Sequence, residues 1–170
     1  MAIKIRKGSA ADTESYLRLL HVVKEHMDHP EWFYLDPDED VRVMMANGMM
    51  ELWVAEDEDG TLAGGFDIIH PGLAECNYGW DLDFSEAELM RVIQMDTAAV
   101  HPNYRGQKLQ WKLMQEAEKS ISQKHRGILL CTVHPDNRYS LQNVLKQDYT
   151  IVKKKEKYGS VRYILRKDLP

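Results

Sequence analysis

The stretch VIQMDTAAVHPNYRGQKLQ, residues 92–110, decides how this chain folds. Its first half, Val92 to Val100, is mostly apolar and predicts a strand. His101 and Pro102 end that strand. After the turn that follows them, apolar residues recur every three or four positions, which predicts an amphipathic helix. We therefore expect a strand, a glycine-containing turn and a helix in direct succession.

A helix that begins directly after such a turn is suited to binding a phosphate group. The first backbone N–H groups of a helix have no partner inside the helix, and the positive end of the helix dipole lies there. Arg105 and Lys108 add positive charge, and Gly106 permits a left-handed turn or the close approach of a ligand. The bland alternative is a turn that only joins strand to helix. We favour the phosphate-binding interpretation because strand, turn, helix and downstream pattern agree.

The same stretch resembles motif A of the GNAT superfamily of N-acetyltransferases, in which Val-x-Pro-x-Tyr-Arg-Gly opens the loop that binds the pyrophosphate of coenzyme A. The matching residues are Val100, Pro102, Tyr104, Arg105, Gly106 and Leu109. Lys108 stands in the place of the second glycine of the family pattern, and Gln110 in the place of a small residue. Lys108 either crowds the turn or places an ammonium group beside the phosphates, and the sequence leaves both open.

The resemblance implies that acetyl-CoA is the co-substrate and that it lies along the strand end, the loop and a later helix. The implied binding residues are Ala98, Ala99, Val100, Arg105, Gly106, Gln107, Lys108, Leu109, Gln110, Asn137 and Ser140. Backbone N–H groups near residues 98–100 would polarise the thioester carbonyl. Asn137 is equally a good helix cap, and the two roles are compatible.

Two polar residues of the strand are the catalytic candidates. Strand alternation places Gln94 and Asp96 on one face, and GNAT enzymes often have a glutamate or histidine at one of these two positions. Asp96 is our candidate general base, acting directly or through water. The alternative is a carboxylate that forms a local hydrogen bond beside Thr97.

The general acid is an open question. Many GNAT enzymes have a tyrosine that gives a proton to the departing thiolate, but Val144 occupies the matching position here. The proton then comes from Tyr139, from Tyr149 or from water, or the thiolate leaves unassisted. Val144 here and Lys108 in the loop, at two positions of the family pattern, motivate the alternative of a noncatalytic acyl-CoA-binding sensor.

Residue patterns predict the rest of the fold. The expected elements are a strand near residues 3–6, a helix from Ser9 or Asp12 to about His26, a helix over 40–47 closed by Gly48, strands over 51–56 and 62–69, a short helix over 85–91, a strand over 128–133, a helix from Asn137 to about Gln147, and strands over 150–155 and 161–166. This order is similar to that of the GNAT acyl-CoA N-acyltransferase fold. It implies an α/β (α+β) class with a mixed central sheet of six to seven strands and helices on both faces.

Length and composition limit the number of domains and the classes of partner to expect. A chain of 170 residues predicts a single domain, residues 1–170. Neither a bilayer-spanning stretch nor a secretory signal is visible in the sequence, so we expect a cytoplasmic protein without a membrane partner. The net charge of -5 argues against a nucleic-acid partner and fits a cationic acceptor. Family members are often dimers, so the resemblance is compatible with a homodimer.

Other reactive groups have structural explanations. We expect Cys131, in an apolar strand, to be a buried thiol rather than an acyl-carrying nucleophile. We expect no metal site, since His26 and His29 beside a proline are typical of an exposed helix end. The lysine-rich run 153–157 predicts a charged edge strand.

The acceptor is an amine of a small molecule or peptide, as the resemblance implies. The aromatic run 32–34 and the acidic run 36–40 are candidates to line the acceptor site. The alternative is that the aromatic residues pack in the core and the acidic residues face solvent. Asp81 and Asp83 either meet a cationic acceptor or belong to an ordinary surface loop. We thus expect an acetyl-CoA-dependent N-acetyltransferase that works by direct attack in a ternary complex.

Overall fold

The computed structural model describes residues 2–122 and 127–170. The chain forms two compact units. The first unit comprises Met1–Ile69 and Asp96–Ser120, and the second comprises His70–Met95 and Ile121–Pro170. Seven strands are hydrogen-bonded in the order β1-β2-β3-β4-β5-β7-β6, and β4 (Val92–Val100) belongs to both units. The predicted mixed sheet is confirmed, because β4 and β5 are parallel while the other described pairs are antiparallel.

The strands of the first unit form a meander. Strand β1 (Lys4–Lys7) pairs with β2 (Met50–Glu56), and β2 pairs with β3 (Leu62–Ile69), both antiparallel. A turn at residues 57–61 joins β2 to β3, as the acidic and glycine residues there predict. These strand limits lie within one residue of the predicted ones.

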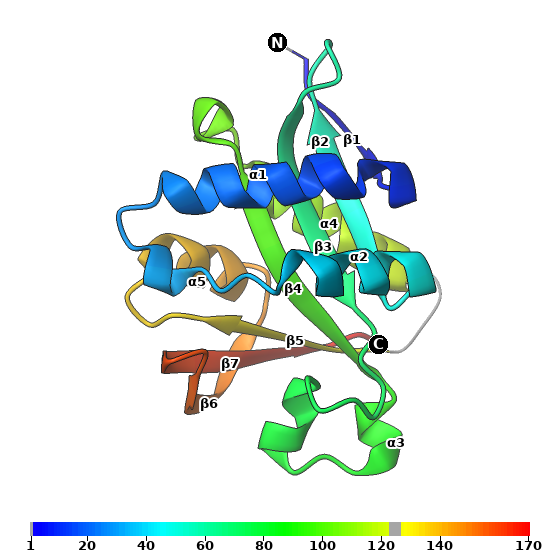
Figure 1. Cartoon of the computed structure of the whole chain (residues 1–170). Helices are drawn as coiled ribbons and strands as arrows, with labels where there is room; N and C mark the ends of the chain where they lie inside the picture. Colours follow the sequence, from blue (N-terminus) through cyan, green and yellow to red (C-terminus); the bar gives the residue numbers. More distant parts are fainter. Residues whose placement is uncertain (1, 123–126) are drawn as a thin grey trace. The chain divides into compact units, whose positions relative to one another are not determined.

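Helices cover both faces of these strands. Helix α1 (Thr13–Glu25) and helix α2 (Asp38–Asn47) lie on one side, and α4 (Leu109–Ser122) lies on the other (Figure 1). Two adjacent glycines of β3 show this directly. A Cβ at Gly65 would meet the ring of Tyr16 on α1, whereas a Cβ at Gly64 would meet Leu113 on α4.

The first unit has its own apolar core. The predicted apolar face of α1 is buried, and it packs with residues of α2 and the strands. The members of this core are Tyr16, Leu17, Leu19, Leu20, Val23, Val41, Met50, Leu52, Val54, Ile69 and Ala99. Ser9 caps the short 3-10 helix η1 (Ala10–Asp12) that leads into α1, and Gly48 ends α2 with a left-handed backbone. Helix α2 begins two residues before the predicted start because three acidic residues favour its first turn.

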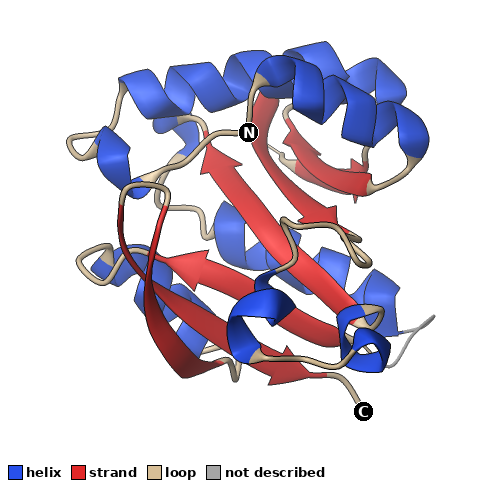
Figure 2. Ribbon diagram, turned by 60° about the horizontal axis from the view of Figure 1, so that its bottom comes forward, coloured by secondary structure: helices blue, strands red, loops and turns tan. Residues whose placement is uncertain are grey.

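The second unit contains the remaining elements. The short helices η3 (Tyr78–Leu82) and α3 (Glu86–Leu89) precede β4, and β5 (Ile128–Val133) pairs with it. Helix α5 (Arg138–Leu145) follows, and then β6 (Thr150–Lys157) and β7 (Ser160–Asp168) form a long hairpin (Figure 2). Both turn residues, Tyr158 and Gly159, have positive φ, so the hairpin continues two residues beyond the predicted end of its first strand.

No helix in the described part of the chain has the length and apolar character needed to cross a bilayer.

Candidate functional site

The predicted strand, turn and helix are all present in the first unit. Strand β4 ends at Val100, the short helix η4 (Pro102–Tyr104) follows, and α4 begins at Leu109. The carbonyl of Lys108 accepts a hydrogen bond from the N–H of Lys112 at 3.0 Å, so Lys108 is the residue that precedes the helix. A lysine side chain cannot accept a hydrogen bond, so it cannot cap the N–H groups of the first turn of the helix.

The backbone of this loop turns left-handed twice. Gly106 has a φ of 83° and Lys108 a φ of 58°. A Cβ added at Gly106 would have no neighbour within 4 Å, so open space faces this residue. Residues 105–108 are exposed, whereas Leu109 is buried. The loop therefore combines open space, a helix N-terminus and two cationic side chains, which suits a phosphate ligand.

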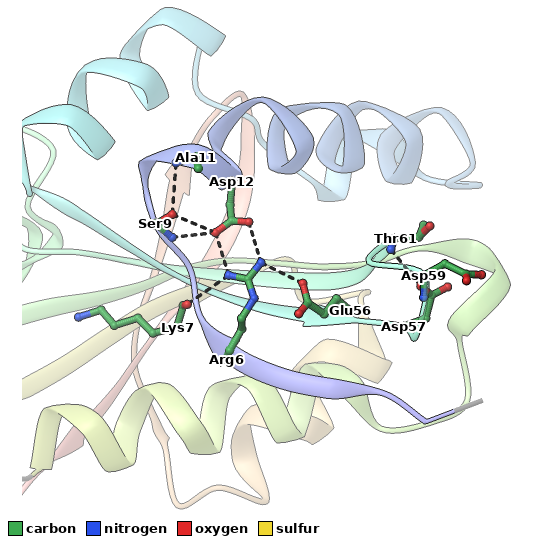
Figure 3. Close-up of polar contacts among 9 residues, drawn as sticks. All are labelled: Arg6, Lys7, Ser9, Ala11, Asp12, Glu56, Asp57, Asp59 and Thr61. Atoms are coloured by element: carbon green, nitrogen blue, oxygen red, sulfur yellow. Dashed lines mark hydrogen bonds and ion pairs between the residues drawn. The ribbon is translucent and has the colours of Figure 1, made fainter.

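The carboxylate of Asp57 holds this loop from the β2–β3 turn. The Tyr104 hydroxyl donates a hydrogen bond to Asp57 Oδ2. The other carboxylate oxygen of Asp57 accepts hydrogen bonds from the backbone N–H groups of Asp59 and Thr61, at 3.0 and 2.9 Å (Figure 3). The N–H of His101 donates to the carbonyl of Ala63 at 2.9 Å. Loop and turn are thus fixed together.

Ion pairs of Arg6 connect β1 to the end of β2 and to the residue that precedes α1. The Arg6 guanidinium donates to Asp12 and to Glu56, each at 2.9 Å (Figure 3). The hydrogen bond from Arg6 lowers the pKa of Asp12. Because Asp12 also accepts from the N–H of Ser9, this group joins the start of α1 to the sheet.

Asp96, the candidate base, is half-buried on β4. Its Oδ2 accepts a hydrogen bond from the Thr97 hydroxyl at 3.0 Å. The predicted local contact with Thr97 is therefore present. It occupies one carboxylate oxygen and does not by itself exclude proton transfer.

A second carboxylate near Asp96 was missed by the sequence analysis. Asp67 on β3 is 2% exposed, and its Oδ2 accepts a hydrogen bond from the Tyr16 hydroxyl at 2.6 Å. Its Oδ1 has no hydrogen-bond partner among the described residues. Burial, together with the negative charge of Asp96, raises the pKa of Asp67 well above its usual range. The available signal was a lone carboxylate inside the apolar run 62–69.

The acidic run after α1 contributes to the same region. Asp36 is half-buried, and burial together with Asp40 raises the pKa of its carboxyl group. Burial raises the pKa of Tyr34, and the charges of Asp36, Asp40 and Asp96 raise it further. Of the aromatic run, Phe33 packs against the core, whereas Tyr34 is 42% exposed. Phe33 thus has the predicted role of core packing, and the lining of an acceptor site by this run stays a prediction.

The remaining predicted residues lie in the second unit. Gln94 is buried, and its Oε1 accepts from the N–H of Tyr78 at 2.7 Å, so this oxygen anchors η3. Asn137 caps α5 by accepting from the N–H of Ser140 at 3.3 Å. Catalysis by Gln94 and cofactor binding by Asn137 and Ser140 stay predictions. Val144 is buried.

The two tyrosines proposed as acids differ in environment. Tyr139 is 67% exposed, while Tyr149 is buried with the Lys167 ammonium over its ring.

Burial and local contacts describe the other reactive side chains. Burial raises the pKa of the Cys131 thiol to about 12, which confirms a buried structural thiol. The carboxylate of Asp81 binds Lys155 and Lys157 of β6, and so stabilises the lysine-rich edge strand. His29 stacks on Trp32. No group of three or more metal-ligating side chains that could hold a metal ion occurs in residues 2–122 and 127–170.

Family comparison agrees with this arrangement. The sequence matches the Acetyltransferase (GNAT) family over residues 19–147, which include β4, the loop and α5. The chain therefore belongs to the GNAT family of acetyltransferases. No curated protein sequence shows significant similarity to it.

Solved GNAT structures share the fold. A GNAT acetyltransferase from Streptococcus pneumoniae is 16% identical with a TM-score of 0.74, covering 99% of this chain and 100% of that one. NAA60 of Arabidopsis thaliana in complex with acetyl-CoA is 15% identical with a TM-score of 0.73, covering 99% of each chain. The acetyltransferase yncA from Salmonella typhimurium with acetyl-CoA is 16% identical with a TM-score of 0.68, covering 100% of this chain and 95% of that one. These likenesses concern the fold.

Proposed function

We propose that residues 1–170 form one acetyl-CoA-dependent N-acetyltransferase domain that acetylates a primary amine of a small molecule or peptide. The observation that carries the proposal is the loop between β4 and α4, with Gly106 open and left-handed beside Arg105 and Lys108. Family membership supports acetyl-CoA as the ligand of this loop. We expect the pyrophosphate to bind residues 105–110 and the thioester to lie along residues 98–100.

The proposed reaction is direct transfer in a ternary complex. The neutral amine nitrogen attacks the thioester carbon, and an N–C bond forms as the carbonyl oxygen becomes negative. The C–S bond then breaks, and the sulfur leaves as thiolate or takes a proton to become a thiol. The amine proton passes to a base, for which we propose Asp96, directly or through water. The products are an N-acetyl amine and coenzyme A.

Release of coenzyme A thiol from acetyl-CoA with a panel of primary amines tests this proposal. Amine-dependent release supports the transferase. Tight binding of acetyl-CoA without amine-dependent release would favour the noncatalytic sensor, and failure to bind acetyl-CoA would remove both. An Asp96→Asn variant with an unchanged rate-versus-pH profile would eliminate Asp96 as the base.

The proton donor to the thiolate needs its own test. If turnover is unchanged in both Tyr139→Phe and Tyr149→Phe, neither tyrosine is the proton donor. The proton then comes from water, or the thiolate leaves without one. A cytoplasmic location, the absence of nucleic-acid and membrane partners, and a homodimer remain predictions.

A further inference from the structure

Tyr16 of α1 reaches two strands of the first unit. Its side chain is fully buried, and its ring lies against Gly65 of β3, where an added Cβ would meet ring atoms at 2.6 and 2.7 Å. Residues 65 and 67 share one face of this strand, since side chains alternate along it. The Tyr16 hydroxyl lies 2.6 Å from Asp67 Oδ2 and 3.4 Å from the carbonyl oxygen of Thr97 on β4. The hydroxyl group thus joins β3 to β4.

The Tyr16 hydroxyl has one hydrogen for these two acceptors. If Tyr16 donates to an ionised Asp67, the Thr97 carbonyl is left with the longer contact. If Asp67 is protonated, its own O–H donates to the tyrosine oxygen, and the Tyr16 hydrogen is available to Thr97. Burial and the charge of Asp96 raise the pKa of Asp67, which favours the protonated form. A neutral acid also loses less by leaving Oδ1 without a hydrogen-bond partner among the described residues.

The Thr97 carbonyl belongs to the peptide group whose N–H is that of Ala98. A trans peptide is planar, so its C=O and N–H point in opposite directions and turn together. A hydrogen bond to the carbonyl therefore fixes the direction of the Ala98 N–H and, by polarising the peptide group, makes it a stronger donor. Thr97 also donates from its hydroxyl to Asp96 at 3.0 Å. One residue of β4 thus connects Tyr16 to the proposed base and to the first of the residues expected beside the thioester.

We propose that Tyr16 and Asp67 are positioning residues of the transferase, which hold the Thr97–Ala98 peptide group so that its N–H faces the thioester carbonyl. This inference rests on the proposed function. During attack by the amine, negative charge develops on the carbonyl oxygen, and a donor that is already oriented and polarised stabilises this charge. Neither Tyr16 nor Asp67 contacts the reacting atoms, and the proton of Asp67 stays within the chain of hydrogen bonds.

The stretching frequency of the bound thioester carbonyl tests the contact without an acceptor. Acetyl-CoA that is isotopically labelled at this carbonyl carbon is bound to the natural protein and to Tyr16→Phe, and infrared difference spectra are recorded. We expect the carbonyl band at higher frequency in Tyr16→Phe, because the Ala98 N–H is a weaker donor without the tyrosine hydroxyl. Acetyl-CoA affinity, measured by calorimetry, should change by less than about twofold. An unshifted band with intact binding would overturn the inference.

Kinetics with the primary amine that is acetylated fastest gives a second test. In Tyr16→Phe, kcat should fall about tenfold, while the KM for acetyl-CoA changes by less than about twofold, because the oriented N–H acts on the transition state. Asp67→Leu should behave like Tyr16→Phe. Asp67→Asn should keep kcat within about twofold, since an amide N–H can donate to the tyrosine oxygen as the carboxylic acid does. Tyr163 is half-buried on β7 in the second unit, and Tyr163→Phe is the matched control with unchanged kcat and KM.

The outcomes separate the inference from the proposed function. An equal loss of kcat in Asp67→Asn and Asp67→Leu would show that Asp67 does not act as a hydrogen-bond donor. An unchanged kcat in Tyr16→Phe would overturn the positioning role, and either result leaves the N-acetyltransferase intact. Tyr16→Phe keeps the buried ring, so it decides the test if Asp67→Leu does not fold. Acetyl-CoA binding without amine-dependent thiol release in the natural protein would overturn the proposed function, and the carbonyl band would still report on Tyr16 alone.

Discussion

The Tyr104 hydroxyl donates a hydrogen bond to the carboxylate of Asp57, which joins the candidate phosphate loop to the turn between β2 and β3. Tyr104 is part of the family motif, but Asp57 lies 47 residues earlier in the chain. The same carboxylate accepts two backbone hydrogen bonds within its own turn. Asp57 therefore positions the loop without itself being exposed to a ligand there.

We predict that Tyr104→Phe weakens coenzyme A binding about three- to tenfold, because the loop loses a charge-assisted hydrogen bond while its packing is kept. Isothermal titration calorimetry measures the effect. Tyr104→Phe and Asp57→Asn should be non-additive in the double variant. Additive losses would show that the two residues act on the loop independently.

The same contact predicts a pH effect. The hydrogen bond from Tyr104, followed by those from Thr61 and Asp59, lowers the pKa of Asp57 in the folded protein. A carboxylate with a lowered folded pKa contributes stability that is complete above its unfolded pKa, about 3.9, and is lost as pH falls through the folded pKa. Removing the Tyr104 hydroxyl should therefore move the acid-unfolding midpoint to higher pH, as followed by circular dichroism. An unchanged midpoint would contradict this role.

Two substitutions of Lys108 distinguish the effect of backbone strain on stability from the effect of its charge on coenzyme A binding. Its φ of 58° is a left-handed conformation that costs a residue with a Cβ roughly 1 kcal/mol compared with glycine. We predict that Lys108→Gly unfolds at higher denaturant concentration than Lys108→Ala, while both bind coenzyme A more weakly than the natural protein because both lack the ammonium group. If Lys108→Gly binds coenzyme A more tightly than the natural protein, Lys108 crowds the loop instead of contacting the phosphates.

The two adjacent glycines of β3 should respond differently to alanine. At Gly65 a Cβ would lie 2.6 and 2.7 Å from ring atoms of Tyr16, whereas at Gly64 the nearest atoms are at 3.1 and 3.2 Å. We predict that Gly65→Ala lowers the free energy of unfolding by about 1 to 3 kcal/mol, since the buried ring of Tyr16 must move. Gly64→Ala should cost less. Urea unfolding measures both, and equal losses would mean that Tyr16 adapts freely.

We expect Asp67 to stabilise the folded protein less than asparagine would at the same position. Its folded pKa is raised, chiefly by burial, above the unfolded value, so the folded state binds more protons between these two values and stability falls as pH rises through that window. We predict that Asp67→Asn is more stable than the natural protein at pH 8, by about 1 to 3 kcal/mol, and that this gain disappears below pH about 4. Urea unfolding at the two pH values measures it. A loss of stability at pH 8 would contradict this account of Asp67.

The sequence determined the order of the elements and most of their limits. The apolar run 62–69, the apolar face of α1 and the glycine after α2 are local patterns, and local hydrogen bonding and burial enforce them. The loop between β4 and α4 was predictable for the same reason, because strand, turn and helix follow one another without interruption. Its left-handed Gly106 was expected, but the left-handed Lys108 was not, since lysine carries no local preference for that conformation.

Tertiary structure alone decided which distant side chains meet. Nothing in the order of residues pairs Tyr104 with Asp57, or Tyr16 with Asp67, because these contacts depend on how β2, β3 and α1 pack. The burial of Asp67 also comes from packing, and burial is what shifts its pKa and leaves an oxygen without a partner in the described structure. The position of these carboxylates thus follows from the folded chain.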